Sequence, residues 1–315
     1  MLAGCNKAGE EKLNTESKAI LEKTVYHIQQ HGPLEKIDES IANIYPKTSA
    51  NEYLGFMYYV LRTKRGVTLN QLDQALIFAD TAEHVYANAS PRLRRELRTE
   101  YLDFLIHKGN LLFARKKYIA GYDVFFKILQ LLKKYPYKDL EGIVYHSMGM
   151  NSYKQKVYGK AAEYFKQELA SIDLTPDEYL PSTFRFFRRQ EALSNTAACY
   201  LKLKMQDSAS LYCTTALNYV ENFHKGNCNI DQYSACRAVI LANFAKLYLL
   251  KNLPDTAIHY YHQSIYLTFY RPLQNTRSGR DVKHGGESLI ELADIYRSKG
   301  DLKKFRKRVE ELNKW

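Results

Sequence analysis

The chain has 315 residues, of which 45% are apolar and 25% are charged, and this balance is typical of globular rather than disordered proteins. Its 15 glycines and 8 prolines are few for this length, which favours an all-helical fold over a turn-rich sandwich or barrel. The 46 Lys+Arg exceed the 34 Asp+Glu by a formal +12, but the excess is spread over helical patterns. We therefore expect solvated helix faces and no nucleic-acid partner, because no nucleic-acid-reading motif accompanies the charge.

The N-terminus carries the pattern of a lipobox, the site at which bacterial lipoprotein signal peptides are cut and lipidated. The tetrapeptide is Leu2-Ala3-Gly4-Cys5, and polar residues follow it. Residues 1–10 are interpreted as a lipobox remnant and tether whose leader is truncated, because the charged and apolar regions that should precede it are missing. This interpretation predicts lipidation of Cys5 and an extracytoplasmic, membrane-anchored protein in the periplasm or on the cell surface. A cytoplasmic protein with a chance match is the alternative.

Helical patterns follow the tether. Residues 11–45 predict one or two helices, broken at the His31-Gly32-Pro33 segment. A looser repeat begins after residue 46, and Ser90-Pro91 reads as a helix cap followed by proline in the first turn. Small and aromatic residues mark two hairpins in this part, namely Leu54, Gly55, Tyr58, Ala75 and Ala82, and then Gly109, Tyr118, Gly121 and Phe125.

The second half contains a repeat with a period of 48 residues. Ala161, Ala209, Ala257 and Phe305 occupy equivalent places at identical intervals. Around the first of them, Tyr145 and Gly149 precede a Tyr-x-x-Ala-x-x-x-Phe pattern at 158–165. The pattern resembles the tetratricopeptide repeat (TPR), in which small residues sit where the two helices of a hairpin cross closely.

This resemblance implies an all-α, TPR-like α-solenoid of about five or six helical hairpins, forming a single domain over 11–315 with its repeats in 46–315. A period of 48 exceeds the usual 34, and we expect the first helices to take the extra length, as in Asp177–Met205 and Ile230–Leu250. Thr175-Pro176 and Pro254-Asp255 read as helix starts. The sequence ends within the last hairpin, so either Lys303–Arg308 cap this hairpin or, as we expect, the parent protein continues past Trp315.

The sequence offers no catalytic motif. It lacks a glycine-rich phosphate loop, a His-Glu-x-x-His motif and paired Cys-x-x-Cys motifs, so we predict a non-enzymatic protein with no cofactor and no metal site. Cys199, Cys213 and Cys236 fall inside apolar helical patterns and are expected in the core. Cys228 lies in a loop-like segment, where a bridge to Cys236 is conceivable only if a helix begins after it.

In the TPR family the first helices of the hairpins line a concave groove that takes peptides or partner helices. By resemblance, the groove-facing residues here are His146, Met150, Tyr153, Asn195, Lys202, Asn243, Lys246 and Arg297. Asn195 and Asn243 are 48 residues apart and therefore equivalent. A side-chain amide both donates and accepts hydrogen bonds, so this pair could hold a peptide backbone whatever its sequence. The alternative is that these amides bond between neighbouring helices.

The sequence therefore predicts a protein- or peptide-binding TPR scaffold, either an extracytoplasmic lipoprotein or the sensory region of a bacterial signalling protein. Two alternatives stay open. One is a glycan-binding outer-membrane lipoprotein, and the other is a cytoplasmic TPR regulator.

Overall fold

The structure is a computed structural model that describes residues 38–39, 41–42, 52–137, 139–176, 180, 182–223, 230–270 and 279–313. Every element from α3 to α15 in this part of the chain is helical, which confirms the predicted fold class. The chain divides at Leu140 into two compact units, which we call unit 1 and unit 2 and describe separately. A single domain over 11–315 stays a prediction. Cys5, the lipobox and most of residues 11–45 lie outside the described residues.

Unit 1 contains two long hairpins joined by a short helix. Its helices are α3 (Glu52–Thr68), α4 (Leu72–Asn88), α5 (Pro91–Glu96), α6 (Arg98–Ala114) and α7 (Tyr118–Lys134). The Ser90 side chain accepts a hydrogen bond from the Leu93 N–H, which confirms the helix start predicted at Ser90-Pro91. Helix α3 packs on α4 and α6 packs on α7, so each hairpin buries its own apolar faces.

An ion cluster joins three helices of unit 1. The carboxylate of Glu83 on α4 accepts hydrogen bonds from Lys108 on α6 and Lys127 on α7, both at 2.6 Å. Burial alone would raise the pKa of Glu83, but these two lysines outweigh it and lower the pKa to about 2. Glu83 is therefore ionised at neutral pH and holds α4, α6 and α7 together.

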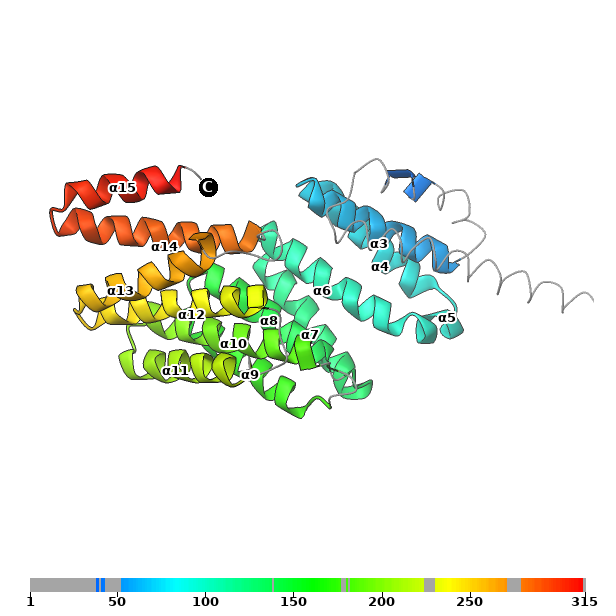
Figure 1. Ribbon diagram of the computed structural model, residues 1–315. Helices are drawn as coiled ribbons and strands as arrows, with labels where there is room; N and C mark the ends of the chain where they lie inside the picture. Colours follow the sequence, from blue (N-terminus) through cyan, green and yellow to red (C-terminus); the bar gives the residue numbers. More distant parts are fainter. Residues whose placement is uncertain are drawn as a thin grey trace, which may run out of the picture. The chain divides into compact units, whose positions relative to one another are not determined.

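Unit 2 contains four hairpins, drawn from green to red in Figure 1. The first helices are α8 (Leu140–Lys154), α10 (Ser182–Lys202), α12 (Ile230–Leu250) and α14 (Gly279–Ser298). The second helices are α9 (Tyr158–Leu174), α11 (Gln206–Phe223), α13 (Pro254–Ile265) and α15 (Leu302–Leu312). All four first helices end 48 residues apart, and all four second helices begin 48 residues apart. The predicted period is therefore confirmed, and the described part of the chain holds six hairpins in all.

The small residues of the repeat lie at the helix crossings, as expected. Ala161, Ala209 and Ala257 are each 0% exposed. Cys199, Cys213 and Cys236 are also buried, which confirms their placement in the core, whereas Cys228 lies outside the described residues. The apolar interior of each hairpin thus comes from the residues that define the period.

Helix boundaries agree with the sequence in most places and differ in one. Helix α12 has the predicted bounds, and α13 starts at Pro254 as predicted. Thr175, expected to cap α10, instead ends α9: its N–H bonds to the Ile172 carbonyl, and its hydroxyl donates to the Ser171 carbonyl. Helix α10 begins at Ser182, not at Asp177. A threonine that bonds back into the preceding helix closes that helix rather than opening the next one.

Candidate functional site

The first helices of unit 2 share one surface, which we call the A-helix face (α8, α10, α12 and α14). Helix α12 packs against α10 on one side and against α14 on the other. Helix α8 reaches α10 through Met150, whose sulfur accepts a hydrogen bond from the Asn195 amide at 3.8 Å. The predicted groove residues all lie on these four helices.

One repeat position on this face links each first helix to the preceding one. Residues Asn195, Asn243 and Glu291 are 48 apart. Asn195 bonds to Met150, Asn243 donates to the Ser194 carbonyl at 3.1 Å, and Glu291 pairs with Lys246 at 3.4 Å. Met150 and Lys246 are themselves repeat equivalents, whereas Ala198, the residue between them in the frame, has no polar group. Asn243 therefore turns to a backbone carbonyl instead.

The two asparagines differ in their surroundings. Asn243 is 6% exposed, and its amide is engaged with the main chain of α10. This position matches the alternative in which the amide bonds between helices. Asn195 is only half-buried, and its amide contacts a thioether sulfur, which is a weak acceptor. A ligand's carbonyl could displace that contact at small cost.

Glu291 is a residue of this face that the sequence reasoning missed. One carboxylate oxygen faces Lys246 on α12, and the other accepts a hydrogen bond from the Tyr261 hydroxyl on α13. Burial, together with the charge of Glu291, raises the pKa of Tyr261, so this phenol stays protonated and donates. The signal in the sequence was its place 48 residues after Asn243.

His146 is held by a buried carboxylate. Its Nδ1 lies 3.0 Å from Oε2 of Glu168 on α9, and its ring meets the edge of Phe165. Burial alone would lower the pKa of His146, but the hydrogen bond and charge of Glu168 raise it overall. His146 is therefore tied into the α8/α9 hairpin, with a quarter of its side chain exposed to a ligand.

Tyr153 is a half-buried residue of α8. Burial raises its pKa to about 12, and Cys199 and Tyr158 contribute in the same direction. The phenol is therefore protonated at neutral pH and can donate a hydrogen bond.

The remaining predicted residues are the three basic ones. Lys202 is exposed at the end of α10, and Lys246 is half-buried against Glu291. Arg297 is exposed on α14 and pairs with Asp294 at 2.9 Å. The structure thus pairs Met150 with Asn195 and Lys246 with Glu291, whereas Lys202 and Arg297 are exposed.

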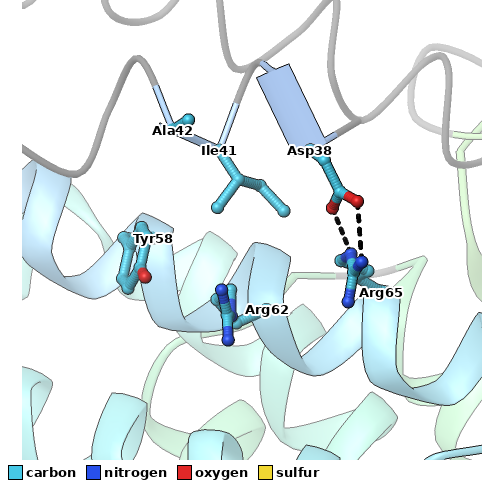
Figure 2. A pocket seen from close by; sticks show the side chains of 6 residues that line it. All are labelled: Asp38, Ile41, Ala42, Tyr58, Arg62 and Arg65. Carbon is cyan, nitrogen blue, oxygen red and sulfur yellow. Dashed lines mark hydrogen bonds and ion pairs between the residues drawn. The ribbon is translucent and has the colours of Figure 1, made fainter. Parts of the chain in front are cut away.

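A separate cavity of about 530 Å³ lies in unit 1, as Figure 2 shows. Tyr58, Arg62 and Arg65 of α3 form one wall, and Ile41 points toward them from the other side. Asp38 pairs with Arg65, and Arg62 lies over the Phe78 ring at 4.5 Å. None of the residues predicted for the groove lines this cavity.

Within the described ranges, His, Cys, Asp and Glu side chains nowhere gather in a group of three that could hold a metal ion. Among the helices that the structure describes, none has both the length and the apolar character needed to cross a membrane.

Neither a protein-family model nor a curated protein matches the sequence, but solved structures share its fold. The apo quorum sensor NprR from B. thuringiensis is 14% identical with a TM-score of 0.58, covering 95% of this chain and 76% of that one. NprR in complex with its cognate peptide NprX is 15% identical with a TM-score of 0.54, covering 94% and 76%. Apo RapI is 14% identical with a TM-score of 0.58, covering 94% and 97%.

These comparisons correct one prediction. The extracytoplasmic, membrane-anchored location inferred from Cys5 is contradicted, because the chain shares its fold with the quorum sensor NprR and with RapI, and the comparisons favour the cytoplasmic alternative. A tetrapeptide such as Leu2–Cys5 is short enough to occur by chance, and its residues lie outside the described part of the chain. The repeat geometry and the structural matches together show that the chain has a TPR-like helical-repeat fold.

Proposed function

We propose that this protein is a non-enzymatic, cytoplasmic peptide receptor that binds its ligand along the A-helix face of unit 2. The ligand class is suggested by NprR, whose structure with its cognate peptide NprX shares the fold. The proposal rests on one observation above all. Asn195 presents a half-buried amide whose contact with Met150 is weak, at the repeat position that Asn243 and Glu291 occupy in the next two hairpins.

The spacing of this row suits an extended peptide. Packed helices lie about 8–10 Å apart, and three residues of an extended, polyproline-II-like peptide span roughly the same distance and return to the same side of the chain. One polar side chain per repeat could therefore meet a peptide backbone group at every third residue. Hydrogen bonds of this kind hold the main chain, and the neighbouring side chains, such as Tyr153 and His146, would select among sequences.

The test is capture of a library of short random peptides by the immobilised protein, followed by titration of the enriched peptides. Asn195→Ala should weaken their binding about tenfold, which corresponds to the loss of one or two hydrogen bonds. Its unfolding midpoint should stay close to that of the wild type, since only a sulfur contact is lost. Asn218→Ala, the same change at an exposed site on α11, is the matched control.

Asn243→Ala separates ligand binding from helix packing. Because the amide of Asn243 bonds to the Ser194 carbonyl, its removal should lower the free energy of unfolding by about 1 kcal/mol. Peptide affinity that is equal in the wild type and Asn195→Ala, or no enrichment of any peptide, would contradict the proposal.

A further inference from the structure

The hairpin turns of unit 2 expose a row of apolar side chains. We call this edge the turn ridge and define it as residues 154–160, 202–208, 250–256 and 298–304, where each first helix ends and each second helix begins. Val157, Met205 and Leu253 lie 48 residues apart at its centre and are 52%, 48% and 48% exposed. Large apolar side chains are thus exposed at one repeat position in three successive hairpins, a regularity that a random scatter of surface residues would not show.

The same edge concentrates positive charge. It carries nine lysines and three aspartates, so these segments hold a net +6 of the chain's formal +12. Two of the three aspartates form ion pairs with lysines of the ridge itself, Asp255 with Lys299 and Asp301 with Lys304. Lys156 and Lys204 are exposed, and no carboxylate in the described part of the chain pairs with either.

The backbone adds an independent observation. Lys156 and Lys204 occupy the left-handed region, with φ of 63° and 58°, where the last equivalent position holds Gly300. A non-glycine residue there costs about 1 kcal/mol relative to glycine. The positive charge of a lysine interacts favourably with the negative C-terminal end of a helix and offsets part of this steric cost. Lys154 and Lys202, in the last turns of α8 and α10, already supply such a charge. Glycine would therefore suit the fold better at positions 156 and 204, and the lysine side chains there are not explained by folding alone.

Spacing indicates the shape of the partner. Neighbouring hairpins place the three apolar side chains roughly 8–10 Å apart. On an α-helix, residues i and i+7 share a face and lie about 10.5 Å apart. An extended strand suits the row less well, because its third residue points to the opposite face.

We propose that the turn ridge is a docking surface for an acidic amphipathic helix of a partner protein. Apolar residues at every seventh position of that helix contact Val157, Met205 and Leu253, and its flanking carboxylates pair with Lys156 and Lys204. This surface goes beyond the proposed peptide site, with which it shares only Lys202.

The probe is a synthetic helical peptide, cross-linked to hold its conformation, with Leu at every seventh position and Glu beside it. Binding is followed by fluorescence anisotropy with the full chain. A peptide of the same composition in scrambled order is the peptide control. The probe should bind, and its affinity should fall as salt is raised, because exposed charge pairs are screened.

Two ridge variants test the two components. Combined Val157→Ser, Met205→Ser and Leu253→Ser should weaken binding about 30-fold or more. Combined Lys156→Glu and Lys204→Glu should weaken it about tenfold at low salt. Ile119→Ser, Leu174→Ser and Leu211→Ser together are the matched control, since these three residues are exposed away from the ridge. All substituted side chains are exposed, so the variants should fold, which circular dichroism checks.

Equal binding of the ordered and scrambled probes, or equal binding of wild type and ridge variants, would overturn the inference. Binding of RNA or of anionic vesicles, in place of the probe and with the same dependence on the ridge, would also overturn it. Peptide capture by Asn195 is measured separately, so failure of one proposal leaves the other standing.

Discussion

Gly149 of α8 lies against the Phe165 ring of α9, and a β-carbon at Gly149 would come 2.6 Å from that ring. Because Phe165 is fully buried, the ring cannot move aside. The equivalent pair in the next hairpin is Ala197 and Cys213, both also buried. In these two hairpins the same helix crossing is filled by glycine with a large partner or by alanine with a small one, whereas the third hairpin has Ala245 with the large Tyr261.

This pairing predicts that Gly149→Ala lowers the free energy of unfolding when residue 165 is phenylalanine and raises it when residue 165 is small. In the wild type, overpacking costs roughly 1–3 kcal/mol, which exceeds the gain of about 1 kcal/mol from replacing glycine inside a helix. In a Phe165→Cys background the clash is gone, and the same change should stabilise the protein. Urea unfolding of the four proteins in the cycle measures this. An identical change in both backgrounds would show that Gly149 and Phe165 do not interact.

At the scale of elements, each hairpin turns through one left-handed residue. In the second hairpin of unit 2 this is Lys204, whose N–H bonds to the Leu201 carbonyl while the Met205 N–H bonds to that of Tyr200. This is the Schellman pattern, in which glycine is the favoured residue. The turn therefore carries local strain that a single substitution can remove.

Lys204→Gly should raise the free energy of unfolding by about 0.5–1 kcal/mol, because glycine adopts the left-handed conformation without a steric penalty. Gly300→Ala, at φ 74° in the last hairpin, should have the opposite effect. Guanidinium unfolding midpoints give both values. A neutral or destabilising Lys204→Gly would mean that the turn is not strained.

Element boundaries show why sequence reasoning succeeded in one place and failed in another. The starts of α11 and α13 follow from the spacing of Ala161, Ala209 and Ala257, since a buried crossing sets the register of a whole hairpin. The start of α10 does not, because Thr175 can cap either the helix before it or the one after it. The Thr175 hydroxyl donates a hydrogen bond to the Ser171 carbonyl, and the local sequence does not determine which of the two helices it caps.

At the scale of the whole molecule, the fold was predictable and the details of the site were not. The repeat period and the sizes of the residues specify which helices pack together. The partner of each polar side chain depends instead on the three-dimensional positions of the groups around it. Asn243 and Asn195 are equivalent in sequence, yet one is engaged with a backbone carbonyl and the other with a sulfur. The importance of Glu291 became visible only when it was found between Lys246 and Tyr261.

The most direct test of the account is hydrogen–deuterium exchange of the full chain with and without a captured peptide. We predict slower exchange in α8, α10, α12 and α14, with little change in α9, α11, α13 and α15 or at the turn ridge. Ligand contacts along the first helices would produce this pattern, because bound segments open less often. Protection confined to the second helices, or to unit 1, would contradict binding on the A-helix face.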